Sequence, residues 1–110
     1  MTVPVQVTFR DMAHSDAVAA HVERRFEKLG HFSDRIVSCH VVVEEPHRHH
    51  THGKRFAAKI DLQVPGKEIV ITKLLEESKE NMHAAIDDAF DSCERVLEAH
   101  VRKQRERRRV

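Results

Sequence analysis

The chain has few of the features that mark a common functional class. It has no tryptophan or tyrosine, three glycines, three prolines and two cysteines among 110 residues. Three widely separated glycines exclude a glycine-rich phosphate loop, and no nucleophile elbow, CxxC or HExxH motif occurs. The five phenylalanines mostly fall at expected core positions, which argues against a base-stacking platform for single strands. We therefore expect a protein that is not an enzyme and needs no cofactor.

Composition predicts a single globular domain, because 40% of the residues are hydrophobic and 34% are charged. The apolar runs are far shorter than the ~20 residues of a membrane span, and the N-terminus does not resemble a signal peptide. We expect a cytoplasmic location and no membrane partner. Cys39 and Cys93 fall at apolar positions of the pattern, so we expect buried, reduced thiols rather than a disulfide.

Positive charge is concentrated at the C-terminus of a chain whose formal net charge is only +1. Six of the 19 lysines and arginines lie in the last ten residues, opposed there by Glu106 alone. The chain divides into an α/β domain, residues 1–101, and a basic tail, residues 102–110. Clustered cations favour a polyanionic ligand, although a solvated, frayed helix end would have the same composition.

Hydrophobic spacing predicts six elements in the order β-α-β-β-β-α. Strands are expected at residues 2–10, 36–43, 56–64 and 68–72, and helices at residues 16–29 and from about residue 79 into the tail. Ser15 is the expected N-cap of the first helix, Gly30 follows its last turn, and Pro65-Gly66 forms a hairpin turn. We predict a two-layer α/β sandwich, similar to a double-stranded-RNA-binding domain. A four-stranded mixed sheet, with its first two strands parallel and the rest antiparallel, carries both helices on one face.

Charges on the two predicted helices are sorted by face. On the first helix one flank is basic and the other acidic; the basic flank holds His21, Arg24, Arg25 and Lys28, and the acidic flank holds Glu23 and Glu27. The outer face of the second helix begins with Asp87, Asp88, Asp91, Glu94 and Glu98 and ends basic. The pairs Asp91–Arg95 and Glu98–Arg102 have the spacing of ion pairs, so the sorting fits either an RNA-facing surface or ordinary helix stabilisation. Acids on a solvent face are not expected to be catalytic.

Histidines crowd the connection between the second and third strands. It contains His47, His49, His50 and His52, with Arg48, Lys54 and Arg55 close by. Alternate imidazoles could bind a metal, but no cysteine lies in the segment. We expect instead a solvated loop that gains positive charge below pH ~6.5 and contacts phosphate, with no bound metal.

Four segments together resemble the ribosome hibernation promoting factor and ribosome-associated translation inhibitor family. They are HV-x-x-R-x-x-KL at residues 21–29, LQVPG at 62–66, NMHAAID at 81–87 and ER-x-L at 94–97. The resemblance covers residues 3–105 and extends to the histidine-rich loop. It implies a stress protein that occupies the mRNA and tRNA channel of the small ribosomal subunit and silences translation without chemistry.

The family's rRNA-facing basic positions carry over, by this resemblance, to Arg25, Lys28, Arg95 and Lys103. The chain departs from the family at Ser92 and Ala99, where lysine is common, and at His83, where tyrosine is common. The arginine-rich tail is a candidate replacement for those contacts. Long members carry a C-terminal dimerisation domain, and we expect this chain to be a short form.

The expected partner is the small subunit with its 16S-type rRNA, bound by a protein that is monomeric off the ribosome and has no small-molecule substrate. The predicted rRNA-binding residues are Arg24, Arg25, Lys28, Arg48, Lys54, Arg55, Arg95, Arg102, Lys103 and Arg105. An RNA-binding or ribosome-assembly module without a hibernation role is the alternative, and a metal-responsive histidine-loop protein is a third reading.

Overall fold

The computed structural model describes residues 4–45, 56–75 and 82–108. The elements are β1 (Val5–Arg10), α1 (Asp16–Leu29), β2 (Ser38–Glu44), β3 (Phe56–Val64), β4 (Lys67–Leu75) and α2 (Met82–Arg108). The predicted order is confirmed. None of the helices in the described part of the chain combines the length and apolar character that crossing a membrane requires.

Three of the four strands differ from the sequence pattern at one or both ends, by one to three residues, and the pairing explains two of these differences. β2 begins at Ser38 rather than residue 36, because its pairing with β3 starts where Ser38 faces Gln63. β4 continues to Leu75, because all nine residues of β3 find a partner on it. Lys73 interrupts the apolar face of β4 and so hides this extension from a pattern based on hydrophobicity.

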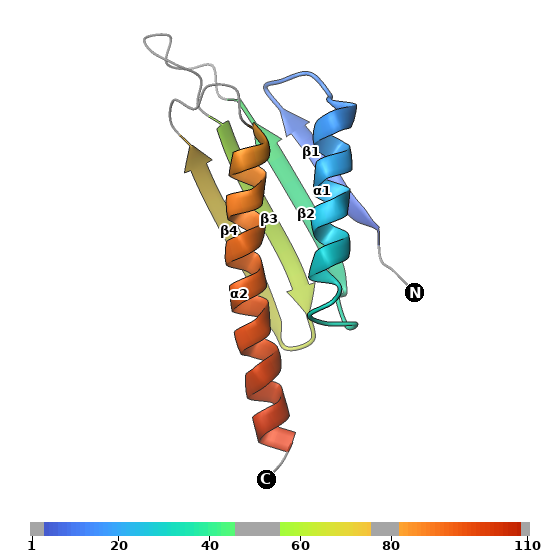
Figure 1. Cartoon of the computed structure of the whole chain (residues 1–110), viewed down its shortest axis with the longest axis vertical. Helices are drawn as coiled ribbons and strands as arrows, with labels where there is room; N and C mark the ends of the chain where they lie inside the picture. Colours follow the sequence, from blue (N-terminus) through green and yellow to red (C-terminus); the bar gives the residue numbers. More distant parts are fainter. Residues whose placement is uncertain (1–3, 46–55, 76–81, 109–110) are drawn as a thin grey trace.

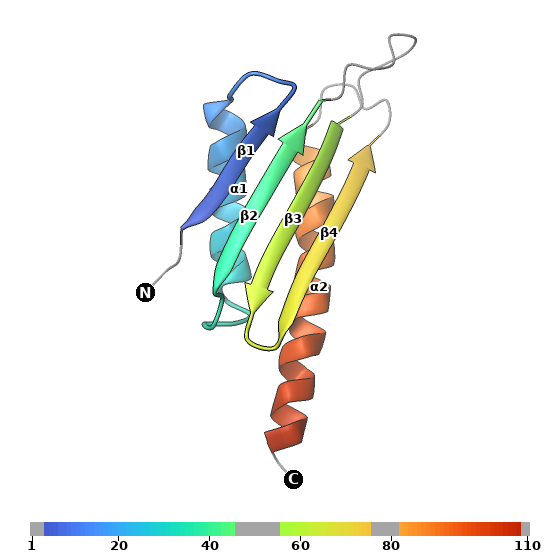
Figure 2. The same cartoon turned by 180° about the vertical axis from the view of Figure 1, so that it is seen from behind.

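The sheet has the strand order β1-β2-β3-β4. β1 and β2 are parallel, and β2, β3 and β4 form an antiparallel meander. The two-residue turn between β3 and β4 places Gly66 at a φ of 82°, a left-handed conformation that glycine adopts without strain. Both helices cover one face of the sheet, with α1 over β1 and β2 and α2 over β3 and β4 (Figures 1 and 2). The predicted two-layer fold is thereby confirmed.

The core lies between the helices and the covered face of the sheet. Its largest fully buried side chains include Phe90 and Leu97 from α2, Leu29 from α1 and Ile60 from β3. Cys39 and Cys93 are buried free thiols, and burial raises the pKa of each to about 12, so both stay uncharged at neutral pH. The uncovered face carries exposed polar side chains, Gln6, Thr8 and Lys59, and also the exposed apolar side chains Val70 and Leu74 of β4.

The ends of the helices position the charged residues described below. Ser15 caps α1 as predicted, since its Oγ accepts a hydrogen bond from the Val18 amide at 3.2 Å. Gly30 follows α1 in a right-handed conformation with a φ of −62°. α2 has 27 residues and is about 40 Å long, and its last turns project beyond the β3–β4 hairpin (Figures 1 and 2). The predicted tail therefore continues the helix as far as Arg108.

Candidate nucleic-acid interface

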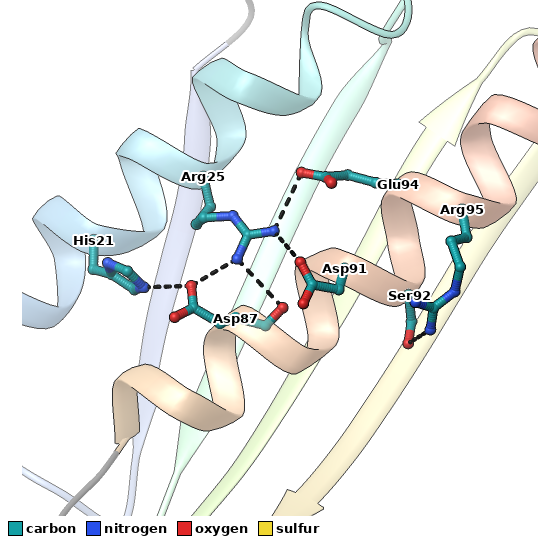
Figure 3. Close-up of polar contacts among 7 residues, drawn as sticks. All are labelled: His21, Arg25, Asp87, Asp91, Ser92, Glu94 and Arg95. Atoms are coloured by element: carbon teal, nitrogen blue, oxygen red, sulfur yellow. Dashed lines mark hydrogen bonds and ion pairs between the residues drawn. The ribbon is translucent and has the colours of Figure 1, made fainter.

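Arg25 links the two helices through a cluster of carboxylates (Figure 3). Its Nη1 donates to Asp87 Oδ1 at 2.6 Å, and its Nη2 donates to Asp91 Oδ1 at 2.7 Å and to Glu94 Oε2 at 3.2 Å. The Arg25 side chain is only 13% exposed, and its guanidinium lies 5.6 Å from the centre of the Phe90 ring. Arg25 thus joins α1 to successive turns of α2, from Asp87 to Glu94.

The electrostatics of this cluster keep its charges fixed. Burial alone would lower the pKa of Arg25, but hydrogen bonds to Asp91, Asp87 and Glu94 outweigh it and raise the pKa above its ordinary value. Burial acts to raise the pKa of Asp87, yet hydrogen bonds from Arg25 and from His21 Nε2, at 2.7 Å, hold it below its ordinary value. The guanidinium and the Asp87 carboxylate are therefore both charged at neutral pH.

The cluster overturns two expectations about α2. Asp87 and Glu94 were expected on the solvent face, but both face α1, where they form ion pairs with Arg25. Asp91 pairs with Arg25 and not with Arg95, whose Nη2 donates instead to Ser92 Oγ at 3.1 Å. The predicted pair of Glu98 and Arg102 is confirmed at 3.3 Å.

The basic flank of α1 separates into an inner and an outer part. His21 and Arg25 contact α2, whereas Arg24 and Lys28 are exposed. Neither Arg24 nor Lys28 forms a hydrogen bond or ion pair with another residue in the described part of the chain. Of the predicted α1 residues, these two have side chains free to reach an external anion.

A groove of about 320 Å³ runs between α2 and the start of β4; we call it the β4-side groove. It brings Arg95 and Lys103 together with Lys67, which was not among the predicted rRNA-binding residues. Val96 and Ala99 also line it. Two side chains of α2 hold the helix against the hairpin, as His100 Nε2 lies 3.3 Å and Gln104 Nε2 3.4 Å from the carbonyl oxygen of Pro65. Lys67 directly follows the Pro65-Gly66 turn, and this position at the end of the hairpin was the signal in the sequence that could have identified it.

Two of the positions at which the chain departs from the family that it resembles, Ala99 and Ser92, lie next to these cations. Ala99 lines it, and a side chain this small leaves room between Lys67 and Lys103. Ser92 is buried and accepts the hydrogen bond from Arg95, so it positions a cation rather than supplying one.

Most cations of the last three turns of α2 are exposed and without an ion pair among the described residues. Arg102 binds Glu98, and the others are Lys103, Arg105, Arg107 and Arg108. A helix with several free cations on its surface suits a row of backbone phosphates, because each phosphate carries one negative charge and accepts hydrogen bonds.

Three predicted residues, Arg48, Lys54 and Arg55, lie outside the described residues, as does the histidine-rich loop. Within residues 4–45, 56–75 and 82–108, no group of three or more His, Cys, Asp or Glu side chains could hold a metal ion.

Comparison with known proteins gives a family and two similar structures. The model of the Sigma 54 modulation protein / S30EA ribosomal protein family matches residues 5–105. The N-terminal domain of Protein Y from Thermus thermophilus has a TM-score of 0.70 at 21% identity, over 91% of this chain and 99% of that one. A ribosomal subunit interface protein from Coxiella burnetii has a TM-score of 0.67 at 16% identity, over 87% of this chain and 94% of that one. A search of curated protein sequences gives no significant match.

The two solved structures confirm the fold, and the family model assigns the chain. The match to the family model spans almost the whole sequence and includes every motif on which the resemblance was based. Ribosome binding, ribosome hibernation and translation regulation fit this assignment. The chain belongs to the Sigma 54 modulation protein / S30EA ribosomal protein family, as its resemblance to the hibernation promoting factors indicated.

Proposed function

We propose that this protein binds the small ribosomal subunit in the channel used by mRNA and tRNA, and that it silences translation there during hibernation without catalysing a reaction. Its partner is the 16S-type rRNA of that channel, in the cytoplasm. The observation that carries this proposal is the surplus of free cations on the second half of α2. Residues 95–108 carry six lysines and arginines against two glutamates, and among the residues that the structure describes an ion pair holds only Arg102.

Free exposed cations favour a phosphate partner for a thermodynamic reason. Binding rRNA releases the counterions condensed on its phosphates, and a cation already paired inside the protein would have to break that pair first. Lys103, Arg105, Arg107 and Arg108 have no such pair among the described residues. They can bind phosphate without loss of an internal contact.

The two helices present their cations on the same layer of the molecule. Arg24 and Lys28 lie on α1, Arg95 and Lys103 on α2, and both helices cover one face of the sheet (Figure 1). The Arg25 cluster joins the helices, so it sets the spacing between the two rows of cations. We assign Arg25 to positioning within the binding surface, and we retain Arg48, Lys54 and Arg55 as candidate contacts.

Family membership and the name of the Coxiella burnetii relative, a ribosomal subunit interface protein, support a site on the intersubunit side of the small subunit. The mRNA and tRNA channel opens on that side. An elongated molecule with phosphate-binding cations on a projecting helix is suited to such a channel.

Co-sedimentation tests the proposal directly. Purified protein is centrifuged with isolated small subunits, with large subunits and with total RNA of equal mass, and the bound fraction is measured across a salt series. We expect saturable binding to small subunits, weaker binding to the other two, and inhibition of in vitro translation. Small subunits preloaded with mRNA and tRNA should bind less protein, because their channel is filled.

Equal retention on bulk RNA and on small subunits would replace the proposal with the alternative, a general RNA-binding or assembly module. Undiminished binding to preloaded subunits would place the site outside the channel.

A further inference from the structure

A second groove lies on the opposite side of α2 from the β4-side groove; we call it the loop-side groove. It measures about 370 Å³ and separates the α1–β2 connection from the C-terminal turns of α2. Phe32 and Val101 supply apolar lining, and Arg35, Arg105 and Arg108 supply cations. Its volume falls within the ~300–1,000 Å³ of small-ligand clefts.

The aromatic wall of this groove is held in place by local hydrogen bonds. The Phe32 amide donates to the Leu29 carbonyl at 3.0 Å, and the Arg35 amide donates to Ser33 Oγ at 3.1 Å. Phe32 packs partly against the core and keeps part of its surface exposed, unlike the fully buried Phe90.

The cations of the groove are uncommitted. The side chains of Arg35, Arg105 and Arg108 form no hydrogen bond or ion pair with any described residue, and Asp34 is the one carboxylate in the lining. His31, Phe32, Val101 and Arg105 also line a hollow of about 270 Å³, so these four residues lie at the centre of a continuous surface. The hollow adds Glu98 and Arg102, which form an ion pair with each other. An apolar centre beside several guanidinium groups matches a base attached to a phosphate.

We propose that the loop-side groove binds one unpaired nucleotide, with its base against Phe32 and Val101 and its phosphate on Arg105 and Arg108. The inference rests on the proposed function in one respect, since unpaired rRNA would be the source of that nucleotide. Guanidinium groups bind phosphate through two parallel hydrogen bonds, and an aromatic ring offers a face to any base. These two features together favour a nucleotide over an acidic peptide, which has no flat group for the ring.

The test measures the affinity of the full chain for a fluorescent unpaired RNA of about eight nucleotides. Replacing Phe32→Leu or Arg105→Gln should each weaken binding by about fivefold or more. Arg10→Gln is the matched control, because Arg10 is an exposed arginine of β1 that lies outside the groove and outside the row of cations on α2. Its affinity should stay within about twofold of the parent.

Thermal melting shows whether Phe32→Leu is folded, and Arg105→Gln keeps the test decisive if it is not, because Arg105 is exposed. Equal losses for Arg105→Gln and Arg10→Gln would overturn the groove and leave only net charge as the cause. Wild-type affinity in folded Phe32→Leu would also overturn the groove. The same conclusion would follow if the substitutions weakened binding of a duplex or of polyglutamate as much as binding of the unpaired RNA.

Competition identifies the source of the nucleotide. A free nucleoside monophosphate that displaces the RNA at millimolar concentration would assign the groove to soluble nucleotides, whereas displacement by unlabelled oligonucleotide alone would assign it to RNA. Co-sedimentation of the same variants with small subunits separates the two proposals. If the protein binds small subunits but Phe32→Leu does not change its affinity for the RNA, the groove proposal alone is overturned. If the groove substitutions weaken RNA binding but the protein does not bind small subunits, the proposed function alone is overturned.

Discussion

The two halves of α2 use their charges in opposite ways. The acidic half, residues 82–94, carries four carboxylates and no lysine or arginine, and three of those carboxylates bind Arg25 of α1. The basic half, residues 95–108, carries six cations, of which Arg102 alone forms an ion pair with a described residue. Charge in the first half holds the molecule together, and charge in the second half is left for a partner.

Position in the fold explains the difference. The acidic half packs beside α1 and against the sheet, where Phe90 and Cys93 are fully buried, whereas the end of the basic half projects past the β3–β4 hairpin (Figure 1). The helix macrodipole also favours acids toward the N-terminus and cations toward the C-terminus, by about 0.3–1 kcal/mol each. That effect accounts for the order of the charges. It does not explain why most cations of the basic half have no ion pair among the described residues, which the proposed binding of an external anion would explain.

Removing the end of the basic half should have the largest effect. Deleting residues 102–110 removes six cations, and we expect small-subunit binding to weaken about a hundredfold at physiological salt and to become less salt-dependent. The fold should survive, because Val101 is the last residue of α2 that packs against the core. Co-sedimentation across a salt series measures the affinity, and thermal melting checks the fold. Unchanged affinity and salt slope would show that the basic half is only a solvated helix end.

Breaking the acidic half should instead cost stability. Arg25→Met retains most of the length of the side chain but leaves Asp87, Asp91 and Glu94 without their cation, so we expect a loss of about 2 kcal/mol in the free energy of unfolding. Arg24→Met, one residue earlier and exposed, should change it by less than ~0.5 kcal/mol. Urea unfolding measures both. Similar losses in the two variants would mean that the cluster contributes little to the fold.

The fold could be predicted from the sequence because each element has a clear local pattern. Alternation in residues 56–64, helical spacing from Met82 to Leu97 and the Pro65-Gly66 turn each specify a local structure, and short connections leave few ways to combine them. The second helix was predicted to run into the basic tail, but its end at Arg108 was not, because a basic tail has no apolar spacing to mark where the helix stops.

The role of Arg25 could not be assigned from sequence, because its partners lie 62 to 69 residues away on another helix. A helical projection put Arg25 on the same flank as Arg24 and Lys28, but only packing decides which edge of that flank faces α2. One signal was present. Asp87, Asp91 and Glu94 form a stripe of acids at helical spacing, and Arg95 is the one cation of α2 close to them, so three acids beside a single cation indicate a further cation from elsewhere.

The outer cations of α1 provide a finer test of which residues face RNA. Replacing Arg24 and Lys28 together with glutamate should weaken inhibition of in vitro translation about tenfold, since two phosphate contacts become repulsive. Replacing Glu23 and Glu27 with glutamine alters the other flank of the same helix and should have little effect. If both double variants inhibit translation equally, α1 contributes no RNA contact and the interface is confined to α2.

The smallest expected effect is on the pH dependence of stability, and it concerns Asp87. Its pKa is lowered in the folded state, since hydrogen bonds from Arg25 and His21 outweigh the opposing effect of burial. A lowered pKa adds stability above the unfolded value of ~3.9, and that stability is lost as the pH falls through the folded value. With the Asp87 side chain 44% exposed, solvent screening keeps the contribution below about 1 kcal/mol.

Urea unfolding between pH ~5.5 and ~3 tests this contribution, in a window below the ordinary histidine range near 6.5. Asp87→Asn should be less stable than the parent at the upper end, and the difference should shrink toward the lower end, where the parent's carboxylate also loses its charge. Asp88→Asn is the matched control, because Asp88 is exposed and has no ion pair among the described residues. Its stability should follow the parent throughout. A constant gap between Asp87→Asn and the parent would show that the carboxylate holds α1 by its shape and hydrogen bonding rather than by its charge.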